Sequence, residues 1–230
     1  MAVRKADAVV FLTEEDKQYL ENHVTKKKAK LLVIPNVVRT DLIGKRDLKP
    51  VLNRPKQVLF IGRLVRQKQV PELIDIWNRI EKQHSDWKLI IVGDGVERGL
   101  VEEKIQNYGL ENVQVEGKQR EIHFYCESSQ ILILASRFEG LPLVLIEGLQ
   151  FGLTEVSFDC PCGPKEIIEN EKNGYIIDNF DQNAFAQRLS ELMENDNLRV
   201  QFSECSLELA KNYLPEKIIP QWIELFQKLK

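Results

Sequence analysis

Two glutamates in one short segment could bind and act on a hydroxylated or anionic ligand. Glu139 and Glu147 are separated by seven residues in the segment 136–148, SRFEGLPLVLIEG. Glu147 is the only charged residue between positions 140 and 154, so a carboxylate there is costly unless it is hydrogen-bonded. The hydroxyl groups of a ribose would satisfy it, and so would a backbone amide or an arginine. The residues alone leave the binding and the structural interpretation open.

The same segment predicts the start of a helix. Pro142 suits the first turn of a helix, because it lacks the amide that is unpaired there in any case. The amides of Leu143 and Val144 would then have no partner within the helix and would point out of its start. Such amides form an anion site, and Glu139 would lie in the loop above it.

Two cations follow an earlier apolar run. In the segment 60–68, FIGRLVRQK, Gly62 ends a predicted strand and allows the backbone to turn tightly. Arg63 and Lys68 come after it and precede a predicted helix. Two cations beside a helix start suit an anionic ligand such as a diphosphate. Solvated surface charge is the alternative interpretation.

A third loop resembles a dinucleotide fingerprint. Gly93, Gly95 and Gly99 stand between a predicted strand and a helix, and Glu116 ends the next strand. An NAD(P)-binding oxidoreductase domain is therefore one hypothesis. However, Asp94 places a negative charge in a loop that would hold a pyrophosphate, and the motif follows the second strand rather than the first. We favour a tight turn that lines a nucleotide site.

A fourth loop, FDCPCGPKEII at 158–168, combines a strand-end acid with a helix start at Gly163 and Pro164. The simplest interpretation of this loop is a turn in which the acidic residue serves as a cap. The chain has four cysteines, of which only Cys160 and Cys162 are close in sequence. That spacing lacks the histidines and cysteines of a zinc site. We expect free thiols and a cytoplasmic location.

Alternating strands and helices must position these loops. Eight short runs rich in Val, Ile and Leu suit strands buried on both faces of a parallel sheet. Helices are predicted over 70–82, 182–194 and 198–213 from their apolar periodicity. This alternation predicts an α/β fold with a doubly wound parallel sheet. The predicted strands are 8–12, 31–34, 58–61, 89–92, 113–115, 131–134, 156–158 and 175–177.

Composition narrows the function classes. The 230 residues are 43% hydrophobic and 29% charged, which excludes a disordered or fibrous chain. The formal net charge of −3 disfavours nucleic acid as a partner. No run approaches the roughly 20 apolar residues of a membrane-spanning helix.

The two ends of the chain do not belong to the central α/β unit. Residues 40–55 are rich in Gly, Pro and charge and predict a linker or an extended loop. The residues before it hold one strand–helix–strand fragment, too small to fold alone. The helix 216–230 carries an apolar face that needs a partner surface. We therefore expect three parts: 1–54, 55–215 and 216–230.

The order of these motifs resembles the C-terminal half of a family-four retaining glycosyltransferase of the GT-B class. The motifs are Gly-Arg-Leu with Lys68, Val-Gly-Asp-Gly, the two-glutamate segment, Gly-Pro-Lys-Glu-Ile-Ile and Asn-Gly-Tyr. The resemblance implies a Rossmann-like domain that binds a nucleotide-sugar donor, and an N-terminal domain that binds the acceptor. It implies no metal and no cofactor.

The resemblance also implies roles for single residues. Arg63 and Lys68 would hold the donor diphosphate, Glu139 would face the donor sugar, and Glu147 would bind the ribose. Lys118 would lie beside the base. The implied donor-binding residues are Gly62, Arg63, Lys68, Lys118, Glu139, Gly140, Leu141, Pro142, Leu143, Val144 and Glu147, with Glu139, Arg63 and Lys68 as the catalytic ones.

The Asp-Cys-Pro-Cys-Gly-Pro segment is similar to enzymes that build bacterial surface polysaccharides, which often use UDP-linked hexoses or N-acetylhexosamines. One departure from the family is Thr154-Glu155, where relatives usually have Pro and an apolar residue. We expect Glu155 to lie at the sheet edge, or the packing around it to differ, without direct contact with the donor.

From the resemblance we expect that most of the acceptor domain is missing from this sequence, since residues 8–40 resemble only its last strand and helix and the crossover into the donor domain. The resemblance implies a UDP-sugar as donor and a glycan or lipid-linked glycan as acceptor, the latter through the missing domain. Peripheral membrane association at the inner face stays open. The alternatives are a non-catalytic nucleotide-sugar-binding module or split subunit, and an NAD(P)-binding oxidoreductase.

Overall fold

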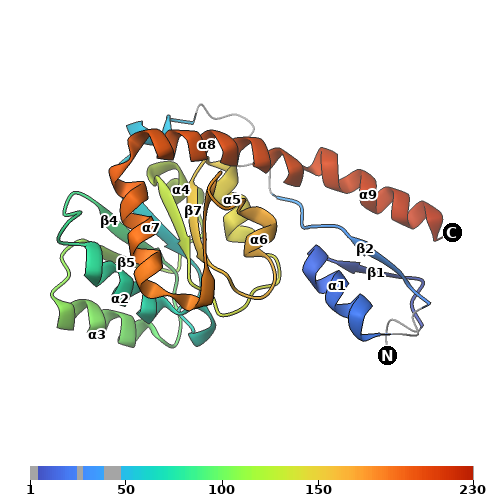
Figure 1. The fold of residues 1–230 in the computed structure, drawn as a ribbon, viewed down its shortest axis with the longest axis horizontal. Coiled ribbons are helices and arrows are strands. Elements are labelled where there is room, and N and C mark those ends of the chain that lie inside the picture. The colour runs from blue at the N-terminus through green and yellow to red at the C-terminus, as the bar shows by residue number, and fades with distance from the viewer. Residues whose placement is uncertain (1–4, 25–27, 39–47, 230) are drawn as a thin grey trace.

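The computed structural model describes residues 5–24, 28–38 and 48–229 (Figure 1). All eight predicted strands are present within these residues. A two-stranded parallel sheet joins β1 (Ala8–Phe11) to β2 (Lys30–Val33). A six-stranded parallel sheet has the order β5-β4-β3-β6-β7-β8. Its strands are β3 (Gln57–Ile61), β4 (Lys88–Val92), β5 (Val113–Gly117), β6 (Ile131–Leu134), β7 (Thr154–Phe158) and β8 (Gly174–Ile177).

This strand order is doubly wound, as predicted. The chain enters at β3 in the middle, adds β4 and β5 on one side, and then adds β6, β7 and β8 on the other. The order reverses between β3 and β6, which are hydrogen-bonded neighbours. In open α/β sheets the crevice beyond the carboxyl ends of the strands at such a reversal is where ligands bind.

Helices cover both faces of the large sheet (Figure 1). On one face, α2 (Val70–Ile80), α3 (Arg98–Tyr108) and α7 (Gln182–Glu194) enclose one apolar core. On the other, α4 (His123–Ser128), α5 (Leu143–Gln150) and α6 (Pro164–Ile167) enclose a second. The predicted helix 198–213 is α8 (Asp196–Ala210) followed by a 3₁₀ turn, Lys211–Tyr213. No helix among the described residues is long and apolar enough to cross a membrane.

The N-terminal fragment lies apart from the large sheet, beneath the last helix, α9 (Pro215–Lys228) (Figure 1). It consists of β1, α1 (Glu14–His23) and β2. Ile34 after β2 and two residues of α9, Ile218 and Leu225, form a small buried cluster of their own. Of the predicted linker 40–55, residues 40–47 lie outside the described residues. The rest includes a 3₁₀ turn, Val51–Asn53, whose Val51 is buried.

One face of α9 is only partly covered. Ile218 and Leu225 pack toward β2, as the small cluster shows. Ile219, Ile223 and Phe226 are 47%, 51% and 58% exposed. These three residues lie at helical spacing along the same side, so the described structure leaves an apolar stripe on this helix in contact with solvent.

Glu155 is not at the sheet edge. It lies on β7, between β6 and β8, and its side chain is fully buried without a hydrogen-bond partner on either carboxylate oxygen. A Cβ built on Gly148 of α5 would lie 2.6 Å from Oε1 of Glu155, so the carboxyl group lies against α5. Burial raises the pKa of Glu155 well above its usual value. The group is therefore neutral when the chain folds.

Replacing Glu155 with leucine is expected to raise stability by about 1–3 kcal/mol at pH 8, because an unpaired buried polar group is removed. The raised pKa fixes the sign of the pH dependence. The folded state holds a proton that the unfolded state loses above the ordinary glutamate pKa, so wild-type stability falls as pH rises. Urea unfolding at pH 5.5 and 8 measures the difference.

The difference in free energy of unfolding between wild type and Glu155→Leu should be larger at pH 8 than at pH 5.5. Glu155→Gln is the matched control, since it removes the titration and keeps a polar group of the same shape. A leucine variant that is less stable than wild type at both pH values would contradict this account.

Candidate functional site

The loops after β3 and β6 are joined to one another at the reversal of strand order. The amide of Arg137 donates to the carbonyl of Gln67 over 2.8 Å. The side-chain amide of Gln67 donates to the carbonyl of Phe138, also over 2.8 Å. These two hydrogen bonds join the loop after β3 to the loop after β6. They thereby fix the neighbouring residues 68 and 139 relative to each other.

Lys68 and Glu139 form an ion pair across this junction. Their side chains are only 15% and 10% exposed, so the pair is little screened by solvent. Gly62 lies beside it, because a Cβ at that position would be 3.8 Å from Cε of Lys68. The structure thus brings three of the predicted site residues together. A partly buried ammonium group at a sheet edge can hold an anion, and Glu139 is placed to face whatever that anion carries.

A third loop, after β7, supports the Glu139 segment. The amide of Glu139 donates to the carbonyl of Pro161 over 3.2 Å. Gly163 has a φ of 104°, and a Cβ there would lie 2.4 Å from both the carbonyl oxygen of Gly140 and Cδ of Pro142. Only glycine fits this close approach.

The buried thiol of Cys160 lies in the same region. Burial, with the nearby charges of Glu139 and Asp159, raises its pKa to about 12. The thiol therefore stays protonated and is a weak nucleophile at neutral pH. All four cysteines are free, as expected.

Helix α5 begins directly after this loop, with Pro142 as its N-cap residue and no side-chain cap. The amides of Leu143 and Val144 therefore have no intrahelical partner, as predicted. The side chain of Leu143 is 45% exposed, whereas Leu141 is buried in the core beneath. Glu147 lies one turn further along the helix. The positive end of α5 thus points toward the edge where Lys68 and Glu139 meet.

Arg63 and Lys118 lie at the same sheet edge but are not part of the buried pair. Arg63 is exposed in the loop after β3, and among the described residues its guanidinium forms no ion pair. Lys118 is exposed after β5, two strands away from β3. Side chains at these two positions could reach a ligand that extends along the carboxyl ends of the strands from β3 to β5.

Two of the three glycines of the fingerprint-like loop have a packing explanation, whereas a Cβ on Gly99 would meet nothing within 4 Å. A Cβ on Gly93 would lie 1.8 Å from the carbonyl oxygen of Gly62, and one on Gly95 would lie 2.3 Å from that of Leu64. Gly93 also has a φ of 154°. The loop after β4 therefore touches the backbone of the loop after β3. Both glycines are required by this contact, and no bound pyrophosphate is needed to account for them.

Sequence reasoning did not single out Gln67, which joins the two central loops. Its role gives no signal in the sequence, because its partner is a backbone carbonyl, which every residue carries. The close approach of Gly163 to Gly140 had a signal, namely a glycine directly before a helix-starting proline. In the sequence such a glycine indicates a turn, and nothing there shows that Gly140 lies against it.

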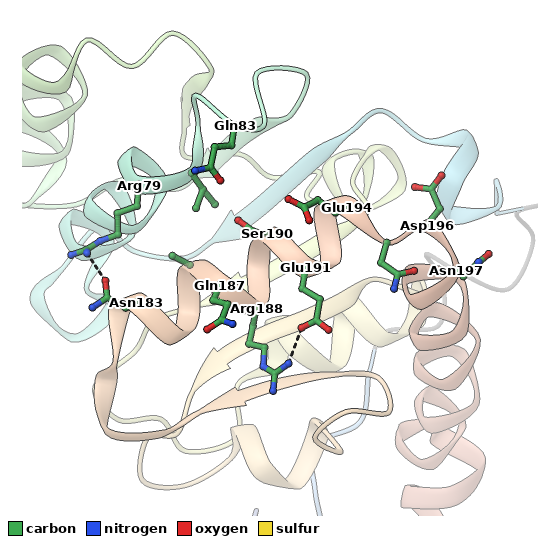
Figure 2. A pocket seen from close by; sticks show the side chains of 13 residues that line it. Arg79, Gln83, Asn183, Gln187, Arg188, Ser190, Glu191, Glu194, Asp196 and Asn197 are labelled. Carbon is green, nitrogen blue, oxygen red and sulfur yellow. Dashed lines mark hydrogen bonds and ion pairs between the residues drawn. The ribbon is translucent and has the colours of Figure 1, made fainter.

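A groove of about 1010 Å³ lies elsewhere, between α2, α7 and the start of α8 (Figure 2). Two of its arginines donate hydrogen bonds to other residues that line it. Arg79 donates to Asn183 over 2.6 Å, and Arg188 donates to Glu191 over 2.8 Å. None of the predicted site residues lines it.

Comparison with known proteins gives a consistent picture. The family model described as glycosyl transferases group 1 matches residues 45–207. The amylovoran biosynthesis glycosyltransferase AmsD of Erwinia amylovora is 35% identical over 224 residues, which are 96% of this chain and 62% of AmsD. An uncharacterized glycosyltransferase of Haemophilus influenzae is 33% identical over 96% of this chain and 62% of its own length. The chain thus spans less than two thirds of these relatives.

Solved structures agree on the fold. Staphylococcus aureus TarM, in complex with Fondaparinux, alpha-GlcNAc-glycerol and UDP, superposes with a TM-score of 0.87 at 27% identity, over 98% of this chain and 45% of TarM. The pneumococcal O-GlcNAc transferase GtfA, in complex with UDP and GlcNAc, gives a TM-score of 0.84 at 23% identity, over 97% of this chain and 45% of GtfA.

Proposed function

Because the chain belongs to the glycosyl transferases group 1 family, we propose that it is the donor-binding part of a glycosyltransferase. The donor is a UDP-linked hexose or N-acetylhexosamine, and the acceptor is a glycan or lipid-linked glycan. The observation that carries the proposal is the Lys68–Glu139 pair at the reversal of strand order, directly before the start of α5. UDP is also present in the complexes of TarM and GtfA, which supports it as the nucleotide.

The arrangement suits transfer of a sugar away from a diphosphate. As the glycosidic bond breaks, negative charge grows on the leaving diphosphate. Lys68, Arg63 and the first amides of α5 would stabilise that charge, which is the electrostatic contribution that catalysis needs. Glu139 would face the sugar. We propose that the transfer retains the anomeric configuration and uses no metal ion, with the cationic side chains taking the role that a metal would have.

We propose that donor binding extends across the sheet edge, with Glu147 at the ribose and Lys118 beside the base. The backbone of residues 140–144 would contact the sugar and the phosphates, since Gly140 and Pro142 are held in place by Gly163. The proposed donor-binding residues are Gly62, Arg63, Lys68, Lys118, Glu139, Gly140, Leu141, Pro142, Leu143, Val144 and Glu147.

We also propose three parts along the chain, with boundaries near residues 54 and 215. The large sheet with its helices is the donor domain, and the β1–α1–β2 fragment belongs to the acceptor side. The apolar stripe of Ile219, Ile223 and Phe226 would then pack against further acceptor-domain structure. The share of AmsD that this chain covers leaves room for such a domain in the whole protein. A binding module without turnover is the alternative, and addition of a separate acceptor domain would restore transfer in that case.

Replacing Glu147 with alanine is expected to weaken UDP binding about ten-fold, because hydrogen bonds from the ribose hydroxyls to a carboxylate are lost. The specific signature is a double comparison with 2′-deoxy-UDP. Wild type should prefer UDP, and the variant should lose most of that preference, since the coupling between the two changes isolates this contact. Isothermal titration calorimetry measures all four affinities.

Circular dichroism would first establish that the Glu147→Ala chain is folded. A folded variant that keeps the full wild-type preference for UDP over 2′-deoxy-UDP would remove Glu147 from the ribose site. Wild-type chain that binds neither nucleotide would instead refute the donor-binding function as a whole.

A further inference from the structure

The N-terminus of α1 has two sources of capping: the side chain of Thr13, which accepts from the amide of Asp16 over 3.2 Å, and a carboxylate from α6. One carboxylate oxygen of Glu166, on α6, accepts hydrogen bonds from the amides of Glu14 over 3.0 Å and Glu15 over 3.4 Å. These are the first two amides of the helix, which have no intrahelical partners. A carboxylate at this end also interacts favourably with the helix dipole. The contact joins residues that are about 150 positions apart.

A second contact beside it uses Cys162. Its amide donates to the carboxylate of Glu15 over 3.2 Å, and its thiol donates to the carboxylate of Asp16 over 3.0 Å. Lys17 in turn pairs with Glu14 at 2.7 Å. Each of the carboxylates gathered at this helix end therefore has its own donor, which is why so many negative charges can meet here. The contact is directional and specific in its hydrogen bonds.

The segment 159–166 that makes these contacts is the same one that holds the Glu139 loop on its other side. Pro161 accepts from the amide of Glu139, and Gly163 packs against Gly140. The hydroxyl of Tyr213 donates to the carbonyl of Glu166 over 2.9 Å and anchors α6 from behind. One short segment thus touches α1 on one side and the Glu139 loop on the other.

We propose that Glu166 is a positioning residue that fixes α1, and with it the acceptor-side fragment, against the loop that carries Glu139. Its carboxylate acts by accepting from backbone amides of α1. This inference rests on the proposed function in one respect, namely that the Glu139 loop is part of the donor site. The contact between α1 and the segment 159–166 is itself defined by the hydrogen bonds given above.

The test compares three variants of the 230-residue chain by NMR amide exchange. Glu166→Ala removes the cap, Glu166→Gln keeps an acceptor oxygen without the charge, and Glu169→Ala is the matched control. Glu169 pairs with Lys172 at 2.8 Å, and no hydrogen bond or ion pair links it to the described residues of α1. Thermal unfolding of each variant checks that the large sheet is intact.

In Glu166→Ala the amides of Glu14 and Glu15 should exchange at least five-fold faster, and the amide of Glu139 at least two-fold faster, because the shared segment loses one support. Glu166→Gln should restore both to within two-fold of wild type. Glu169→Ala should change neither.

Unchanged exchange at Glu14 and Glu15 in Glu166→Ala would overturn the cap. Faster exchange there with no change at Glu139 would overturn the link to the donor loop. Both readouts are made without a ligand, so they stand apart from the donor-binding proposal, which a UDP titration of the wild-type chain tests separately.

Discussion

Replacing Lys68 with alanine is expected to weaken UDP binding roughly 10- to 100-fold, the largest loss from any single side chain at the site. A hydrogen bond from an ammonium group to a phosphate contributes about 1.5–3 kcal/mol. The change also leaves Glu139 without its partner, so its carboxylate would repel the diphosphate. UMP, which carries one phosphate fewer, should be affected less than UDP. Titration calorimetry with both nucleotides measures this.

Two control variants distinguish an effect of position 68 from an effect of losing one positive charge. Lys172→Ala makes the same change in net charge at an exposed lysine that pairs with Glu169 and should leave UDP binding unaltered. Lys68→Arg keeps the positive charge and should retain part of the affinity. If Lys68→Ala bound UDP within two-fold of wild type, Lys68 would have no role in holding the diphosphate.

Replacing Arg199 with leucine is expected to cost about 3–5 kcal/mol of folding stability, because the partners of a buried charge are left unpaired. Arg199 is 1% exposed. It donates to the side chain of Gln130 over 2.9 Å, to the carbonyls of Leu192 and Met193, and to Asp196. Its guanidinium also lies 5.0 Å from the ring centroid of Trp87. Urea unfolding measures the loss.

Arg79→Leu is the matched control, since Arg79 is exposed on α2 and, within the described part of the chain, its side chain hydrogen-bonds only to Asn183 and Gln182. Its replacement should cost less than about 1 kcal/mol. Equal losses in the two variants would show that the buried network around Arg199 does not stabilise the fold as described.

The fold was predictable because the central strands of the large sheet are buried on both faces. A run of Val, Ile and Leu such as that of β6 has no polar alternation and suits a covered parallel strand. The strand order could not be derived from periodicity alone, because any βαβ arrangement would give the same runs. The alternation of strands and helices predicted a doubly wound parallel sheet, which the structure confirms, and the order β5-β4-β3-β6-β7-β8 itself comes from the structure alone.

Glu155 shows where sequence reasoning reached its limit. A charged residue in a strand normally indicates an edge or a solvent-facing position. Here the strand continues through the sheet interior and the carboxyl group stays neutral, which only the surrounding packing reveals. Contacts such as that between Glu166 and the amides of α1 were equally inaccessible, since hydrogen bonds to a backbone leave no pattern in the sequence.

Part of the site was foreseen and part depends on the three-dimensional arrangement. Lys68 and Glu139 were both expected at strand ends, and the reversal of strand order brings them into one ion pair. The roles assigned to Arg63, Lys118 and Glu147 stay predictions, because each depends on where a nucleotide lies along the edge.

We propose above all that this chain binds a UDP-sugar at the carboxyl ends of β3 and β6. Thermal unfolding with UDP, UDP-GlcNAc, UDP-Gal, GDP and NAD tests it most directly. A ligand at 100 times its dissociation constant adds about 2.7 kcal/mol to stability, which is roughly 5–10 °C for a chain of this size. We predict that the UDP compounds raise the unfolding temperature and that NAD does not. A rise with NAD alone, or with none of the nucleotides, would contradict the claim.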